Sequence, residues 1–232
     1  MNMPLTVVGY VKKAIFVAIS LTLFGCVTND PTKLSFKQNN TQSLLLMEMD
    51  PVAGEYGMGI ASFDESSNFV TLSLTGGTGA YFKKSDKSNY AYAVISPGSY
   101  TFTEFVQQDS WALCFHAHTV SFTVEPGQSL FLGHLQTRTH LAQLQQMVSL
   151  FGPSSVRQGD HVYYRDGILP PRIATPSAAD VGRAQQYILE SMPKVQATLA
   201  PVLYRSAKFD VGHDIFGNML CLGYGRKPLP NS

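Results

Sequence analysis

Seven short apolar runs, separated by turn residues, constrain the fold of residues 43–136 more than any other feature of the chain. Apolar and polar residues alternate in runs such as SYTFTEFV (99–106), the pattern of a β-strand with one buried face. Turn signals such as Pro97-Gly98 and Pro126-Gly127 separate the runs. The predicted strands are 43–49, 68–75, 79–83, 89–95, 99–106, 112–124 and 129–135. They predict a mainly β fold, an antiparallel β-sandwich or a small barrel.

The periodicity becomes helical after about residue 138. Apolar residues recur at helical spacing from Leu141 to Phe151, and again from Val181 to Met192. Thr175-Pro176 reads as an N-cap followed by proline at the first helical position, and Pro193 ends or restarts the second helix. We expect the last stretch, 203–225, to be extended and to pack on the β domain. The sandwich therefore carries C-terminal helices as additions.

The first 25 residues have the pattern of an export signal. Lys12 and Lys13 precede an uncharged apolar run from Ala14 to Phe24. This run has the length of a signal-peptide core and is shorter than the roughly 20 residues of a membrane-spanning helix.

The end of this run, Leu23-Phe24-Gly25-Cys26, resembles the bacterial lipobox, in which the cysteine is lipidated. The resemblance implies cleavage before Cys26 and a covalent lipid on that residue, with no other cofactor expected. Two or more acyl chains attach a protein firmly to a bilayer. Val27 follows the cysteine, and by resemblance to Gram-negative lipoproteins a residue other than Asp there implies the outer membrane. We expect the periplasmic face of that membrane.

The predicted organisation has four parts. Residues 1–25 form the signal peptide, and 26–42 form the lipidated cysteine with a flexible, polar tether. Residues 43–136 form the sandwich domain, and 137–232 form a helical and extended region packed on it. Net charge is +1, and only 14% of residues are charged. Without a basic excess, nucleic acid is not an expected partner.

Two similar hairpins, YAVISPGSYTF and SFTVEPGQSLF, lie within the predicted sandwich. The stretch AVISPGSYTFTEF, followed by HTVSFTVEPGQSLFLGHL, resembles the prealbumin-like sandwich of small bacterial lipoproteins. It is also similar to PEGA-type and carboxypeptidase-regulatory-type domains. The resemblance covers about residues 43–136. It implies a non-enzymatic module of the cell envelope and transfers no catalytic residue.

The stretch ALCFHAHTVSF (112–122) contains the most reactive residue types. If one strand runs through it, Cys114, His116 and His118 share a face with Phe122, toward the core. A hairpin at 125–127, with Gly127 in the left-handed conformation, would pair His118 with His134. The three histidines would then meet at one rim of the sheet.

Three readings of this cluster stay open. The histidines with the Cys114 thiolate could bind Zn²⁺ or Cu²⁺. Cys114 could instead form a disulfide with Cys221, because these two cysteines remain after lipidation and the periplasm is oxidising. Free buried thiols with hydrogen-bonded histidines are the third reading. We favour the disulfide, which closes a loop of about 107 residues.

Catalytic patterns are weak in this sequence. Neither a Gly-x-Ser-x-Gly elbow nor a Ser-x-x-Lys motif occurs, although a cysteine with His213 could form a Cys/His pair. Gly76 to Gly79 reads as a turn, and 211–218 as a candidate binding loop. We therefore expect a lipid-anchored envelope protein that binds or scaffolds an envelope partner without catalysis. A periplasmic metal-binding protein and an envelope hydrolase are the alternatives.

Overall fold

The computed structural model of the protein describes residues 30–38, 41–50, 56–71, 79–83, 88–107, 111–138, 141–142, 146, 164–165, 173, 175–213 and 219–221. The elements within these residues are β1 (Phe36–Lys37), β2 (Ser43–Met49), β3 (Tyr56–Asp64), β4 (Phe69–Thr71), β5 (Gly79–Lys83), β6 (Tyr90–Ile95), β7 (Gly98–Gln107), β8 (Trp111–Cys114), β9 (Thr119–Val124), β10 (Ser129–Leu135), β11 (Tyr164–Arg165), α2 (Ala178–Ser191), β12 (Val195–Gln196), β13 (Ala200–Pro201), β14 (Arg205–Ala207), β15 (Gly212–His213) and β16 (Met219–Leu220).

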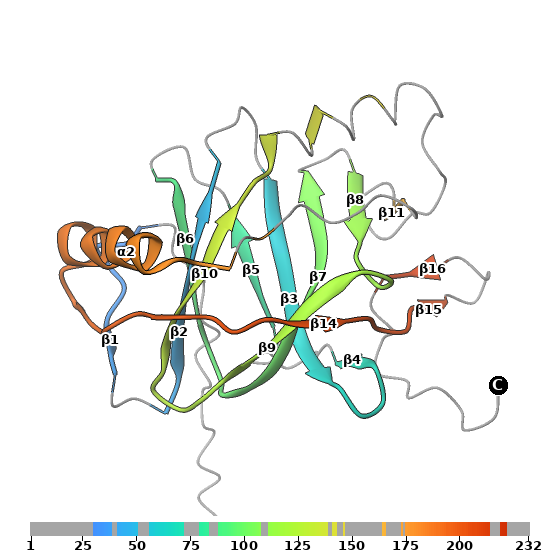
Figure 1. The fold of residues 1–232 in the computed structure, drawn as a ribbon, viewed down its shortest axis with the longest axis horizontal. Coiled ribbons are helices and arrows are strands. Elements are labelled where there is room, and N and C mark those ends of the chain that lie inside the picture. The colour runs from blue at the N-terminus through green and yellow to red at the C-terminus, as the bar shows by residue number, and fades with distance from the viewer. Residues whose placement is uncertain are drawn as a thin grey trace, which may run out of the picture.

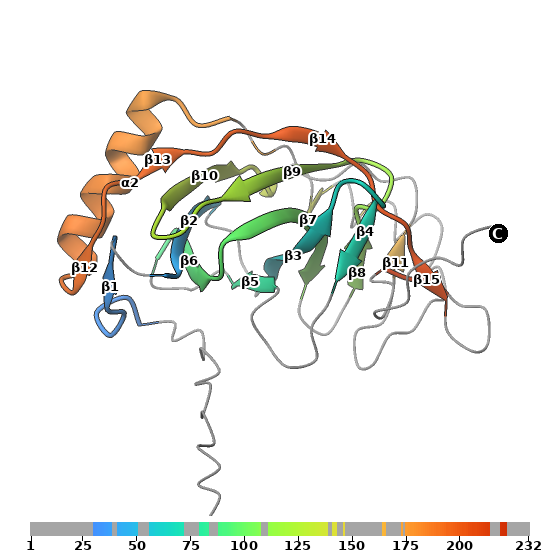
Figure 2. The same ribbon diagram turned by 90° about the horizontal axis from the view of Figure 1, so that it is seen from below.

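Most of these strands belong to two sheets that curl into a half-barrel (Figures 1 and 2). The smaller sheet has the order β13-β10-β2-β6. The larger sheet has the order β11-β8-β7-β3-β4, with β5 also paired to β3, and β9 joined to both β7 and β14. Pairing is mainly antiparallel, but β10 runs parallel to both of its neighbours. The predicted mainly β fold with a helical addition is confirmed.

The main core lies between the inner faces of the two sheets. Strand β2 is buried on both faces, which explains its run of consecutive apolar residues. Its Leu45 and Met47 belong to the main core. Its Leu44 and Leu46 belong to a second cluster, which α2 covers on the outer face of the smaller sheet. The fold is therefore layered as helix, smaller sheet and larger sheet.

Helix α2 forms as the sequence predicts, with one change at its start. Ser177, not Thr175, is the N-cap, and it forms a capping box with Asp180. The sequence signal at Thr175-Pro176 is two residues early, because only Ser177 has an acidic residue three positions later to complete the box. Ala184 and Ile188 of the predicted stripe are buried. The helix ends before Pro193, as expected.

The first predicted helix lies largely outside the described residues. Arg138, Leu141, Ala142 and Gln146 are helical, and Leu141 is buried against the main core. Leu144, Val148 and Phe151 of the predicted stripe fall outside the described part of the chain.

Strand β3 was not predicted, because the glycines in YGMGIASFD (56–64) dilute the apolar pattern. Gly57 has a packing reason: a Cβ there would lie 2.3 Å from the Tyr81 ring. The strand nevertheless pairs with β4, β5 and β7, and it runs through the middle of the larger sheet.

The predicted flexible tether is corrected for residues 30–38. Phe36 is 1% exposed, and β1 pairs with β12 in a small two-stranded sheet. Leu34 packs against the cluster beneath α2. The prediction treated this segment as polar, although Leu34 and Phe36 are apolar and pack in the cluster beneath α2. The folded part of the protein therefore begins by residue 30.

Residues 195–209, here called the C-terminal strap, cross the molecule over the edges of both sheets (Figure 2). Within the strap, β12 pairs with β1, β13 extends the smaller sheet beside β10, and β14 extends the larger sheet beside β9. Arg205 of β14 also forms an ion pair with Glu65, at 2.6 Å. The predicted extended C-terminal segment is confirmed where the structure describes it.

Tyr204 of the strap joins the two sheets directly. Its ring lies against Phe102 and Phe122 of the larger sheet, with ring centroids 6.0 Å away in each case. Its hydroxyl donates a hydrogen bond to the backbone oxygen of Leu132 in the smaller sheet. Burial of the hydroxyl raises the pKa of Tyr204 well above its usual value.

We predict that Tyr204→Phe lowers the free energy of unfolding by about 1–2 kcal/mol, because it leaves the buried Leu132 carbonyl without this donor. Tyr204→Ala should cost about 3–5 kcal/mol, because the ring contacts are lost as well. Urea unfolding measures both changes. Leu203→Ala is the matched control: Leu203 is 80% exposed, and its change should stay within about 0.5 kcal/mol. Equal losses for all three variants would contradict the bridging role.

Candidate functional site

The predicted disulfide between Cys114 and Cys221 is present in the structure. Cys114 ends β8, Cys221 follows β16, and their Cα atoms are 5.3 Å apart. Both residues are buried in a third cluster, on the opposite face of the larger sheet from the main core, and Phe63 and Phe209 belong to the same cluster. The bond links residues that are 107 positions apart and fixes Cys221, beyond the strap, to the larger sheet.

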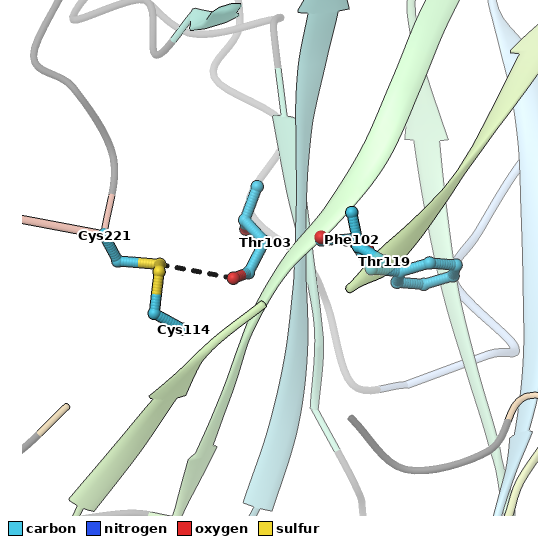
Figure 3. Close-up of a disulfide and its surroundings, with 5 residues drawn as sticks. All are labelled: Phe102, Thr103, Cys114, Thr119 and Cys221. Atoms are coloured by element: carbon cyan, nitrogen blue, oxygen red, sulfur yellow. Dashed lines mark hydrogen bonds between the residues drawn. A yellow bond between two sulfur atoms is a disulfide. The ribbon is translucent and has the colours of Figure 1, made fainter. Parts of the chain in front are cut away.

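Thr103 of β7 lies beside the disulfide (Figure 3). It is the extra residue where the register between β3 and β7 shifts, a β-bulge. Its carbonyl oxygen accepts a hydrogen bond from Phe115 N, at 3.0 Å. The same oxygen lies 3.3 Å from Cys221 Sγ. A disulfide sulfur carries no proton, so the second contact is a close S···O approach and not a donated hydrogen bond.

The strand predicted at 112–124 is two strands in the structure, with a turn between them. His118 N donates to Phe115 O at 3.0 Å and closes this turn. The turn changes which positions face the core, so Leu113 and Phe115 join the main core and Cys114 faces the other way. The expectation that Cys114 shares a face with Phe122 is therefore wrong.

His116 and His118 lie in this turn and not on a strand. His118 is exposed and His116 is half-buried. The backbone oxygen of His116 accepts a hydrogen bond from Phe209 N at 2.8 Å, which ties the turn to the end of the strap.

The predicted pairing of His118 with His134 is also wrong. Gly127 has the expected left-handed conformation, with φ 71°. However, Pro126-Gly127 links two sheets instead of closing a hairpin: β9 pairs with β7 and β14, and β10 pairs with β2 and β13. A Pro-Gly turn has the same local sequence in both cases, so the pattern could not distinguish them.

A second irregularity turns His134 away from the core. The register of β10 against β2 shifts between Phe131 and His134, and Gly133 has φ 95°. Leu132 and Leu135 therefore both belong to the main core, although an even strand would place His134 beside Leu132. Among the described residues, no three His, Cys, Asp or Glu side chains are grouped to hold a metal ion. His116, His118 and His134 thus do not form the expected cluster.

His134 instead pairs with Asp50, which the sequence did not single out. His134 Nε2 lies 2.7 Å from Asp50 Oδ1. The other carboxylate oxygen of Asp50 accepts hydrogen bonds from Thr137 N at 2.8 Å and Arg138 N at 3.1 Å. Burial opposes ionisation of Asp50, but these backbone and histidine contacts outweigh it and lower its pKa below the ordinary value of 3.8.

Tyr56 completes this polar group, which we call the Asp50 cluster: Asp50, Tyr56, His134 and Thr137. The Tyr56 hydroxyl donates to the backbone oxygen of Asp50 and accepts from Thr137 Oγ1, at 3.0 Å. Burial raises the pKa of Tyr56 to about 12. Asp50 directly follows β2 and lies 84 residues from His134, so only the long-range pairing of β2 with β10 brings them together.

The chemistry available to these groups is limited. Both sulfurs of Cys114 and Cys221 are bonded to each other, so neither is a thiolate nucleophile. Asp50 is the hydrogen-bond partner of His134 among the described residues. The Thr137 hydroxyl is buried and donates to Tyr56. The Asp50 cluster therefore joins β2, β3 and β10 and caps the helical segment that starts at Arg138.

Other predicted positions fall wholly or partly outside the described residues. These are Cys26, residues 76–78 of the glycine turn and residues 214–218 of the candidate binding loop. His213 is described only by its backbone, in β15.

We predict that the Cys114→Ala/Cys221→Ala double variant loses about 2–4 kcal/mol of unfolding free energy, because the unfolded chain gains the freedom of the opened loop. Urea unfolding of the variant and of the wild type, each with and without reductant, measures this loss. Reductant should destabilise the wild type alone. Non-reducing peptide mapping that finds both cysteines as free thiols in exported protein would contradict the bond.

We predict that Asp50→Asn lowers the unfolding free energy at neutral pH by about 1.5–3 kcal/mol, the range for hydrogen bonds to a charged group. The native pKa of Asp50 lies below its ordinary value of 3.8, so this stabilisation is full above pH 3.8 and is lost as the pH falls through the lower native value. The difference between wild type and variant should therefore shrink in acid. Glu190→Gln, at an exposed position of α2, is the control. A difference that persists at low pH would overturn this assignment.

In the part of the chain that is described, no helix has the length and apolar character needed to cross a bilayer. No protein-family model, curated protein or solved structure matches the chain. The resemblances to the lipobox and to the prealbumin-like sandwich therefore stay predictions.

Proposed function

We propose that this protein is a lipid-anchored protein of the bacterial cell envelope that acts by binding or scaffolding a partner. The observation that carries the proposal is the buried Cys114–Cys221 disulfide. Structural disulfides form and persist in oxidising compartments such as the periplasm and are rare in the cytosol. The fold and the export signal at residues 1–25 are consistent with the same destination.

The lipobox-like Leu23-Phe24-Gly25-Cys26 supplies the anchor in this proposal. Lipidation of Cys26 would attach the domain to the membrane, and Val27 directs it to the outer membrane. The third cysteine of the sequence then has a role of its own, because the other two are bonded to each other.

The candidate groups of the two alternative functions have structural roles in the fold. Asp50 and Tyr56 make their hydrogen bonds within the protein. The metal-binding alternative was motivated by a cluster of His116, His118 and His134, and these histidines do not meet among the described residues. The hydrolase alternative loses its cysteine nucleophile, because the sulfur of Cys114 is part of the disulfide.

We predict that Cys26→Ala abolishes incorporation of labelled palmitate in a Gram-negative host, because only that cysteine carries the lipid. Intact mass and fluorography of the purified protein measure this. The Cys114→Ala/Cys221→Ala variant is the control and should keep the label. Wild-type protein without label, or a labelled Cys26→Ala variant, would refute lipidation at this residue.

A further inference from the structure

We infer that one end of the folded domain rests against the phospholipid surface. This anchor-proximal end consists of residues 30–34 and 189–194. The inference rests on the proposed lipidation of Cys26, and it deepens that proposal by naming the face that meets the membrane.

The chain between the lipid and the fold is very short. Asp30 lies four positions after Cys26. An extended chain spans at most about 3.6 Å per residue, so the two Cα atoms lie within roughly 14 Å. The Asp30 carboxylate accepts hydrogen bonds from Thr32 N at 3.1 Å and Thr32 Oγ1 at 2.7 Å. Lys33 N donates to Asp30 O at 3.1 Å. Asp30 therefore belongs to a hydrogen-bonded turn at the start of the described residues.

The segment after Asp30 is fixed to the body of the protein. Phe36 N donates to Lys194 O at 3.3 Å, and the Phe36 side chain is buried. Gln38 Oε1 accepts from Thr198 N at 3.2 Å. These contacts hold residues 36–38 against residues 194–198. The short connection to Cys26 therefore limits the distance between the membrane and this whole end of the domain.

The anchor-proximal end carries side chains that suit a bilayer interface. Leu189, in the last turn of α2, is 67% exposed, and among the described residues it is one of two large hydrophobic side chains that are exposed. Lys33 and Lys194 of the same end are exposed. Lysines at such positions can reach phosphate groups while their alkyl stems lie on apolar surface. Asp30 is paired with Lys33 at 3.4 Å, so its charge is partly offset.

The opposite end of the molecule faces away from the membrane in this arrangement. Strands β15 and β16 lie at the far end of the long axis from α2 (Figure 1). The disulfide follows β16. The orientation leaves this end, with its turn containing His118, accessible to a partner in the periplasm.

The test uses the lipidated protein, purified from membranes and reconstituted into vesicles of phosphatidylethanolamine and phosphatidylglycerol. Cys26 is blocked by lipid and the other cysteines are bonded, so an introduced cysteine is the only free thiol. Leu189→Cys and Leu203→Cys each receive an environment-sensitive fluorophore. Both positions are exposed leucines, but Leu203 lies in the strap and outside the anchor-proximal end.

We expect a blue shift and strong quenching by a headgroup nitroxide lipid for the label at Leu189, and neither effect for the label at Leu203. Equal quenching at the two positions, or stronger quenching at Leu203, overturns the inference. Intact mass establishes lipidation beforehand. Protein without lipid refutes the proposed function, whereas lipidated protein with the wrong quenching pattern refutes the orientation alone.

Discussion

Tyr204 is the side chain on which the union of the two sheets depends. Its ring packs on the larger sheet and its hydroxyl bonds to the smaller one. The apolar contacts of the core between the two sheets have no fixed direction. The hydrogen bond of Tyr204, together with those of Tyr56 in the Asp50 cluster, supplies that direction. The strap that carries Tyr204 also adds one strand to each sheet, β13 beside β10 and β14 beside β9.

The strap also connects the two ends of the described chain to the body. At its start, β12 is the partner of β1, the first strand of the fold. Beyond its end, the Cys114–Cys221 bond fixes the tail on the outer face of the larger sheet. In the proposed function, the lipid on Cys26 would be connected through the chain to β1, which pairs with β12 of the strap.

Local patterns predicted elements well and long-range partners poorly. The strands at 43–49, 79–83 and 129–135 have the predicted bounds, because their apolar runs are framed by turn residues. The disulfide followed from cysteine count and compartment. Strand β3 was missed because glycines interrupt its apolar pattern, and the packing of Gly57 against Tyr81 is a contact that no local pattern reveals. The predicted pairing of His118 with His134 was wrong because a Pro-Gly turn such as Pro126-Gly127 is compatible with both a hairpin and a link between two sheets. Asp50 was missed because its partner lies in a distant strand.

Native-state hydrogen exchange tests most directly whether the strap is integral to the fold. Val202 N donates to Phe131 O across the strap, at 3.1 Å, and reports its opening. If the strap unites the sheets, this amide and the amides of β2 exchange only through global unfolding, with the same free energy and the same denaturant dependence. The account is contradicted if the Val202 amide exchanges through a local unfolding of lower free energy while the β2 amides stay protected. The two sheets would then be stable without the strap.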